Sequence, residues 1–327
     1  MYRVLVCLLL LGLSACIKTE SSEGASNYDA PDTLTQVGEV VPILSINGEP
    51  FPDKAFEAGK KAQRIQQLEA AIGIYEASPD SLEAIIWYGR RLGYLGRYHE
   101  AIGVYSTGLE IFPESYKLLR HRGEAFITVR NFDQAKLDLE RAAFYARPFE
   151  DETEPDGLPN RLNRPLTTIK YNIWYHLGLA YYLKGNFDQA ISAYKKCLEV
   201  GDNDDLIVAA STWLYRTYVK IGNVDEAMAI LEPISRNMKL IENRSYLNIL
   251  MLFKNEVTPQ RIYELAIRRD NTLDPTIGYG LGNWYVLQGE VETAKATFDQ
   301  VIASNSWDSF GFIASEVERY NLTSSPL

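Results

Sequence analysis

This 327-residue chain has little of what disulfide-bonded proteins and nucleic-acid binders rely on. It contains three cysteines, too few to indicate a disulfide framework. Lys and Arg number 33 against 43 Asp and Glu, which gives a net charge of −10. Because phosphate binding needs a surplus of basic residues, we expect no general affinity for nucleic acid. The acidity is what a soluble surface needs.

Sequence motifs of catalysis are also missing. There is no Gly-x-Ser-x-Gly turn, no glycine-rich phosphate-binding loop and no His-Glu-x-x-His helix. Cys197 stands where the repeat pattern described below has a small residue, so we expect it to pack in the interior. The acidic triplet at 150–152 could attract calcium, but it lacks the ligand spacing of a loop site. We therefore expect no enzymatic activity, no cofactor and no metal.

The amino terminus has the pattern of a secretory signal. Arg3 is followed by the apolar run 4–13, which is shorter than the roughly 20 residues of a membrane-spanning helix and fits a signal core. This length also argues against an uncleaved anchor. The run ends in Leu-Ser-Ala-Cys16, which resembles a bacterial lipobox, whose cysteine is lipidated. Ordinary cleavage after Ala15 would need a small residue at Leu13, whereas cleavage after Ser14 remains an alternative.

The lipobox resemblance implies that residues 1–15 are a lipoprotein signal peptide and that Cys16 carries the lipid. At least two acyl chains would then hold the protein firmly on its membrane. Residues 16–50 are mostly polar without helical periodicity, so we expect a flexible tether. A short extended piece near 40–46, ended by a turn at Asn47 and Gly48, is possible within it. Ile17 is not the aspartate that retains many lipoproteins at the inner membrane, so the resemblance favours the outer membrane.

A 34-residue period runs through the rest of the chain. Gly89 recurs as Gly123 and Ala101 as Ala135, each after 34 residues. A six-residue phrase that begins with glycine and ends with alanine recurs further on, at 185–190, 222–227 and 289–294. Self-similarity at this period predicts stacked helix pairs, because one pair cannot bury its apolar face alone.

The chain from about residue 60 to 320 resembles the tetratricopeptide repeat family. The best match begins at Tyr171 and continues with Trp174, Leu177, Gly178, Tyr181, Gly185, Phe187, Ala190, Tyr194 and Cys197 at the family spacing. Small residues within each helix let the two axes approach, and large residues around them fill the groove. The resemblance implies an all-α fold, a right-handed superhelical α-solenoid of stacked helix-turn-helix repeats.

The repeat domain is expected over residues 51–327. Clear repeats are expected near residues 82–115, 116–149, 171–204, 208–241 and 275–308. Residues 241–270 are interpreted as a degenerate pair, and a helix over 65–75 as an atypical first repeat. A closing helix over 307–320 brings polar residues such as Glu316 and Glu318, as terminal capping elements require. An insert at 148–170 interrupts the period, and it is either a solvated loop or a binding loop folded over the array.

In this family certain first-helix positions face the concave side of the array. Here they hold mainly aromatic and basic residues: Trp87, Arg90, Tyr94, Lys117, Arg120, His121, Tyr175, His176, Tyr182, Trp213, Arg216 and Lys220. Arg and aromatic residues dominate the binding energy of many interfaces, and a basic groove would attract acidic segments. The alternative is that the aromatic residues only pack against neighbouring helices.

Together these features predict a non-catalytic scaffold that is lipid-anchored in the bacterial cell envelope, on the periplasmic or the cell-surface face. Its expected partner is a protein or peptide, with acidic segments favoured, and not nucleic acid. A surface or periplasmic receptor for a small molecule or glycan is the alternative function, in which Tyr and Trp would stack on the ligand.

Overall fold

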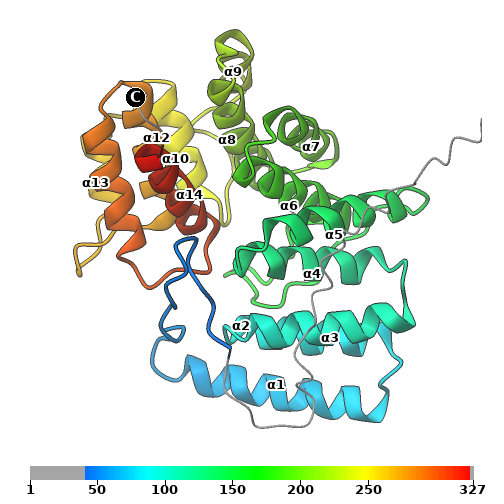
Figure 1. Cartoon of the computed structure of the whole chain (residues 1–327). Helices are drawn as coiled ribbons and strands as arrows, with labels where there is room; N and C mark the ends of the chain where they lie inside the picture. The colour runs from blue at the N-terminus through cyan, green and yellow to red at the C-terminus, as the bar shows by residue number, and fades with distance from the viewer. Residues whose placement is uncertain (1–40, 325–327) are drawn as a thin grey trace, which may run out of the picture. The chain divides into compact units, whose positions relative to one another are not determined.

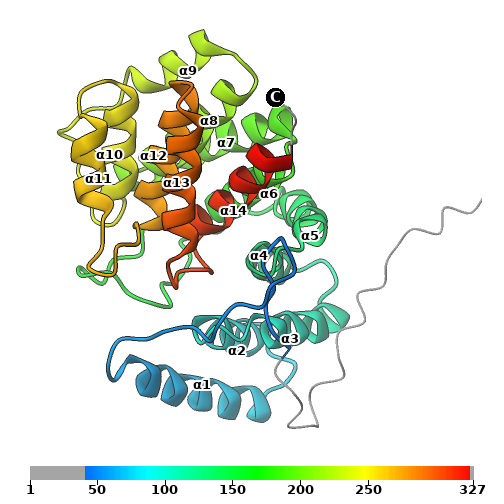
Figure 2. The ribbon, with the colours of Figure 1, turned by 60° about the vertical axis from the view of Figure 1, so that its left-hand side comes forward.

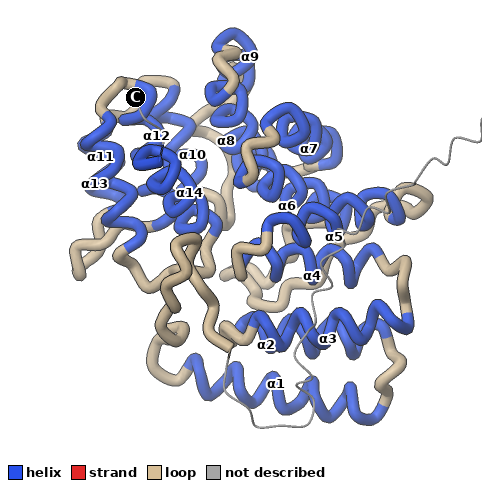
Figure 3. Tube along the Cα trace, in the orientation of Figure 1, coloured by secondary structure: helices blue, strands red, loops and turns tan. Residues whose placement is uncertain are grey.

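The computed structural model describes residues 41–324, and all of them belong to one compact unit. This part of the chain forms fourteen α-helices, and its β-type pairing is limited to three isolated bridges. Figure 3 shows helices joined by loops throughout the described residues. The predicted all-α fold of stacked helix pairs is confirmed.

The helices follow one another in pairs, and nearly every helix packs against its neighbours along the chain, with α10 packing against α8 instead of α9 (Figure 1). A single helix, α1 (Lys60–Ala77), comes first. The pairs are α2 (Leu82–Tyr94) with α3 (Tyr98–Ile111), α4 (Tyr116–Thr128) with α5 (Phe132–Tyr145), α6 (Ile169–Leu183) with α7 (Phe187–Val200), α8 (Asp204–Lys220) with α9 (Val224–Leu231), α10 (Arg244–Phe253) with α11 (Pro259–Ala266), and α12 (Pro275–Leu287) with α13 (Val291–Ile302). The last helix, α14 (Phe310–Ser324), packs against α12 and α13.

The recurring glycine phrase makes the turn inside a pair. Gly185, Gly222 and Gly289 have φ angles of 75°, 73° and 76°, a conformation that is strained for residues with a side chain and open to glycine. The equivalent turn residue between α4 and α5 is Arg130, with a φ of 63°. An arginine held in this conformation needs compensating contacts, and those contacts involve α14.

Glycines also let the two helices of a pair approach each other. A Cβ added to Gly178 in α6 would lie 2.7 Å from the ring of Tyr194 in α7, and one added to Gly282 in α12 would lie 2.3 Å from the ring of Phe298 in α13. Both distances are far below van der Waals contact. Each glycine therefore makes room for a fully buried aromatic ring on the second helix, as the repeat pattern predicted.

The end of the array turns back onto its middle, so that α12 and α14 lie beside α6 and α8 (Figure 2). The hydroxyls of Tyr182 and Tyr279 are 2.7 Å apart, and the Lys220 ammonium donates to Glu318 at 2.6 Å. Glu316 and Glu318 are only 4% and 5% exposed. The prediction that they form the polar side of a capping helix is wrong, because this array ends against its own inner face and not in water.

Residues 41–50 require a correction to the predicted tether. The turn at Asn47 and Gly48 is present, with a Gly48 φ of 83° and a hydrogen bond of 2.8 Å from the Phe51 N–H to the Ile43 carbonyl. Ile43 is buried, and the Phe51 ring stacks on Trp307 with 5.7 Å between centroids. This end of the predicted tether is therefore packed, because its few apolar side chains find partners near the other end of the chain.

The predicted signal peptide (1–15), the lipid attachment site at Cys16 and the tether residues 16–40 lie outside the described residues. Among residues 41–324, no helix has both the length and the apolar character needed to cross a bilayer. Lipid anchoring and the outer-membrane location stay predictions.

Candidate functional site

The twelve residues predicted to line a concave groove come from the first helices of four pairs, α2, α4, α6 and α8. Other segments of the chain occupy most of this face. Seven of the twelve are buried: Arg120, His121, Tyr175, His176, Tyr182, Trp213 and Arg216. Five are partly exposed: Trp87, Arg90, Tyr94, Lys117 and Lys220. The expectation of a groove open along all four helices is therefore wrong, while the role of these residues in binding a partner stays a prediction.

Helices α12 and α14 occupy the part of the face formed by α6 and α8. Trp213 is 1% exposed, its indole N–H donates to the Tyr175 hydroxyl at 2.8 Å, and its ring lies 5.6 Å from that of Tyr279. Phe310, the first residue of α14, packs edge-on against His176 at 5.4 Å. For these aromatic residues the structure supports the packing alternative.

Arg216 is the least compensated charge in this part of the face. It is 3% exposed, and its guanidinium lies 4.6 Å from the Tyr279 ring centroid and 5.1 Å from that of Trp213. Its Nε and Nη2 atoms are buried without a hydrogen-bond partner. Cation–π attraction to the two rings is therefore its main electrostatic support.

The insert occupies the part of the face formed by α2 and α4. Its residues 152–157, here called the acidic strap, lie across these helices. Lys117 Nζ is 2.8 Å from a carboxylate oxygen of Glu152, and Arg120 Nε is 3.2 Å from one of Glu154. Of the two alternatives for the insert, a solvated loop describes the mostly exposed residues 158–165, whereas the strap is folded over the array.

The strap continues from α4 to α2 through main-chain contacts. Arg90 Nη2 donates to the Pro155 carbonyl at 2.8 Å, and Arg91 Nη1 donates to the Gly157 carbonyl at 3.0 Å. A Cβ added to Gly157 would lie 1.8 Å from the Tyr94 hydroxyl, so the strap backbone lies directly against this side chain. Gly157 is thus required where the strap crosses α2.

Glu154 is the buried anchor of the strap, with an exposed fraction of 4%. Its carboxylate accepts a hydrogen bond of 2.9 Å from the Asn172 amide and pairs with Arg120. Burial alone would lower the pKa of Arg120, but the carboxylates of Glu154 and Glu124 outweigh it and raise that pKa. Arg120 therefore stays charged inside the protein because two acids face it.

The two histidines of the predicted groove are neutral at pH 7. Burial lowers the pKa of His176 to about 4. Burial and the nearby charge of Arg120 hold the pKa of His121 well below its ordinary value. The positive charge of this face at pH 7 therefore comes from its Arg and Lys residues.

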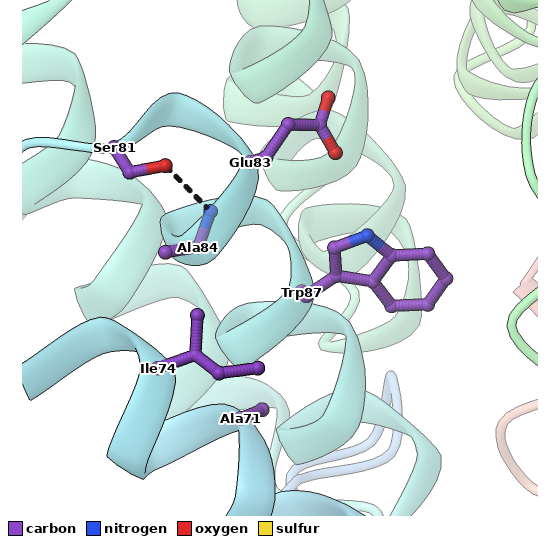
Figure 4. Close-up of a pocket in the computed structure, with 6 residues that line it drawn as sticks. All are labelled: Ala71, Ile74, Ser81, Glu83, Ala84 and Trp87. Atoms are coloured by element: carbon purple, nitrogen blue, oxygen red, sulfur yellow. Dashed lines mark hydrogen bonds between the residues drawn. The ribbon is translucent and has the colours of Figure 1, made fainter. Parts of the chain in front are cut away.

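A small pocket of about 150 Å³ lies between α1 and α2 (Figure 4). It is lined by Ala71, Ile74, Ser81, Glu83, Ala84 and Trp87. Figure 4 shows the Trp87 ring at one end and the Ser81 hydroxyl bonded to the backbone at Ala84, where it caps α2. The guanidinium groups of Arg90 and Arg91 lie 4.4 and 5.0 Å from the Trp87 ring centroid. The pocket and the two cations therefore share one aromatic ring.

The described residues show no arrangement typical of catalysis or metal binding. Within residues 41–324, no group of three or more His, Cys, Asp or Glu side chains could hold a metal ion. Cys197 is fully buried, and burial holds the pKa of its thiol well above the ordinary value. A thiol in this state is a packing group and a poor nucleophile.

Arg91 and Glu154 contact this face but were missed at the level of sequence, because they lie outside the repeat positions that define the concave side. Asn172 does occupy one of those positions, and its amide donates to Glu154. Arg130 also contributes, because its Nε donates to Glu316 at 3.0 Å and its Nη2 to the Trp307 carbonyl at 2.9 Å. Its replacement of glycine in the repeated phrase is the signal that could have revealed it.

Comparison with known families agrees with the helix pairs. Models of the tetratricopeptide repeat match residues 171–204 and 278–306. These segments cover α6 with α7, and most of α12 with α13. The chain therefore contains tetratricopeptide repeats in its middle and near its end.

Several known proteins are similar to parts of the chain. The BBSome complex member BBS4 of Bos taurus is 28% identical over 152 residues, which are 46% of this chain and 24% of that protein. The chain thus spans about a quarter of the length of the curated relative it matches. A solved tetratricopeptide repeat protein from Parabacteroides merdae has a TM-score of 0.46 at 14% identity, covering 79% of this chain and 93% of that one. YrrB, described as a TPR protein with an unusual peptide-binding site, has a TM-score of 0.41 at 15% identity, covering 72% and 92%.

Proposed function

We propose that this chain is a non-catalytic scaffold that binds a protein partner through the first-helix face of its repeat array. The observation that carries the proposal is the partly exposed cluster on α2, where Arg90 and Arg91 stack on Trp87. Arg and Trp are the residues that concentrate binding energy at protein interfaces, and solenoid arrays offer extended surfaces for such contacts. The similarity to a member of a multiprotein complex over part of the chain is consistent with this role.

The proposal extends to the location of the scaffold. The lipobox resemblance at Leu13 to Cys16 supports a lipid anchor in the envelope of a bacterium, with the outer membrane favoured. Cys16→Ser should move the protein from the membrane fraction to the soluble fraction after cell breakage. A Cys16→Ser protein that stays with the membranes through a salt wash would contradict the lipid anchor.

Partner capture tests the binding role. The full-length chain would be cross-linked in cells and purified from detergent-solubilised membranes, as wild type and as a Trp87→Ala, Arg90→Glu variant. The variant should lose the specific partner, because an anchor residue is removed and a charge is reversed on the exposed part of the face. Lys196→Glu is the matched control, since Lys196 is an exposed cation of α7 whose ion pair is with Glu199 of the same helix. The proposal is wrong if both variants retain the same partners as wild type.

A small-molecule or glycan receptor is less well supported. The pocket beside Trp87 is about 150 Å³, whereas sites for drug-sized ligands usually measure about 300–1,000 Å³. The ring of Trp87 is also shared with two arginines, which suits a protein surface better than a closed ligand cavity. The receptor function would instead predict a ligand-dependent rise in melting temperature without any captured protein.

A further inference from the structure

The acidic strap shows which chemistry the α2–α4 face binds. We propose that this face is the docking site for an extended acidic segment of the partner protein, with carboxylates on alternate residues, and that this segment displaces the strap. The inference rests on the proposed scaffold function, since it specifies the segment that the scaffold recognises.

The strap presents its acids with the period of an extended chain. Glu152, Glu154 and Asp156 alternate with Thr153 and Pro155, which are both exposed. The Glu154 N–H donates to the Thr167 carbonyl at 2.9 Å, so the backbone here is paired as in a short β-bridge. In an extended backbone, alternate side chains point to the same side. Glu152 and Glu154 accordingly pair with cations of the array, and one carboxylate oxygen of Asp156 is buried, while Thr153 and Pro155 between them face solvent.

Four cations of the array contact the strap one after another along its length. Moving along the strap from residue 152 to residue 157, the chain meets Lys117 and Arg120 of α4 and then Arg90 and Arg91 of α2. A row of cations with this spacing favours an extended segment that carries carboxylates. A helix or an uncharged loop would leave some of these cations without an ion pair.

The strap fills this row incompletely. Arg90 and Arg91 bond to its main-chain carbonyls, and within residues 41–324 neither has a carboxylate at ion-pair distance. Asp156 has one carboxylate oxygen buried without a partner, and burial raises the pKa of this group. Arg120 Nε also lacks an aligned hydrogen bond. A segment that placed a carboxylate on Arg90 or Arg91 would therefore gain a charge-assisted pair that the strap does not make.

Displacement requires an acidic replacement. Arg120 is buried, so removing Glu154 without a substitute leaves part of its charge uncompensated, which is costly. The strap contains no large apolar side chain, and residues 158–165 beyond it are mostly exposed, so its release costs mainly polar contacts. Asp151 would remain as the hinge, since its carboxylate accepts bonds from Thr168 Oγ1 and the Lys170 N–H at the start of α6. Only a segment with its own carboxylates can thus take the place of the strap.

A peptide with the sequence of residues 152–158, in which Glu152, Glu154 and Asp156 are the only acids, tests the proposal when added in trans. Its affinity would be measured by fluorescence anisotropy for the full-length wild type and for a Glu152→Gln, Glu154→Gln, Asp156→Asn variant in which the strap has lost its acids. The variant should bind at least tenfold more tightly, and the affinity should fall as salt is raised. A control peptide of equal composition, with its acids placed consecutively, should bind at least tenfold more weakly than the alternating one. Equal affinity for both proteins, or for both peptides, would overturn the proposal.

A second variant covers the case in which the triple variant does not fold. Glu152→Gln changes only the exposed end of the strap and should raise peptide affinity about threefold, in line with the weak contribution of an exposed ion pair. An unchanged affinity in this folded variant would also overturn the inference. If the peptide shows no such binding but the capture experiment gives the expected result, only the acidic-segment site is rejected. Loss of partner specificity in the capture experiment would reject the scaffold function itself.

Discussion

The two halves of the first-helix face carry similar residues but differ in what lies on them. On α6 and α8, Trp213 and Arg216 are covered by helices and are 1% and 3% exposed. On α2, Arg90 bonds to one thin strap of chain and stacks on Trp87, and both residues stay partly exposed. The same aromatic and basic types are therefore core on α6 and α8 and partly exposed on α2, while Arg120 and His121 of α4 are buried as well.

This difference follows from what each covering segment brings. Helices α12 and α14 contribute rings and aliphatic groups, such as Tyr279 and Phe310, which exclude water over a wide area. The strap contributes mainly carboxylates and carbonyl oxygens, which form ion pairs that water and other acids can replace. We infer that the α6–α8 half serves stability and that the α2–α4 half serves binding.

The largest expected effect is a core substitution in the covered half. Trp213→Ala removes a fully buried indole and should lower the free energy of unfolding by about 4 kcal/mol. Trp87 occupies the same kind of position in the other half, but its ring is partly exposed. Trp87→Ala should therefore lower the free energy of unfolding by much less than Trp213→Ala does. Urea unfolding of both full-length variants, followed by circular dichroism, makes this comparison. Equal losses would show that the two halves are not distinct.

Next in size is the contact that joins the array to its last helix. Arg130→Ala leaves Glu316 buried without its ion pair and should cost about 3 kcal/mol. Arg130→Gly should be less damaging by about 1 kcal/mol, since glycine adopts the positive φ of this turn without strain. Hydrogen exchange of α14 is the measurement, because local release of that helix would speed its exchange. An alanine variant as stable as the glycine variant would contradict the role of the turn strain.

Acid should weaken the fold around the two buried histidines. The folded-state pKa of His176 is about 4 against an ordinary value of 6.5, so the unfolded chain binds more protons between these values. The contribution of neutral His176 to the free energy of unfolding is fully present above pH 6.5 and is lost as the pH falls toward 4. At pH 5 the loss from this group is about 2 kcal/mol. His121, whose pKa is also lowered, acts in the same direction.

Unfolding measured between pH 7.5 and 5 would show this slope. His176→Asn should flatten it, since asparagine does not titrate in this range. A slope unchanged in that variant would assign the acid sensitivity to other groups.

The smallest effects come from a matched pair of lysines. Lys117→Met removes an ion pair whose glutamate is 46% exposed and should change the free energy of unfolding by less than about 0.5 kcal/mol. Lys220→Met removes the ion pair of Glu318, which is 7% exposed, and should cost about 1–2 kcal/mol because a buried charge loses its partner. Thermal unfolding of the two variants compares them directly. If Lys117→Met lowers the free energy of unfolding more than Lys220→Met, the α2–α4 half contributes more to stability and the two roles must be exchanged.

Much of the fold was predictable because it is local. The glycine turns and the pairing of Gly178 with the aromatic ring of α7 follow from spacing that repeats along the chain. The two helices within 241–270 follow from local apolar stretches of helical period, since this region has little of the repeat consensus. The insert was located by the same period. Its contact with α2 was not predictable, since no periodicity relates Glu154 to Arg120 or Gly157 to Arg91.

The sequence predicted which residue types line the candidate site, but it did not predict which of them are exposed. Family spacing identified Arg90, Arg120 and Arg216 as residues of one face, and all three lie on first helices. Whether such a residue is free depends on segments far along the chain, such as Glu318 in α14, and a repeat pattern carries no information on them.

The sequence by itself determined the helix pairs, their turns and the acidic and basic character of the segments, because these depend on residues within one repeat length. Only the tertiary structure decided which half of the inner face is core and which is surface. The reason is physical: burial is set by the contacts of a side chain with everything near it in space, and the segments that cover this face are distant in sequence.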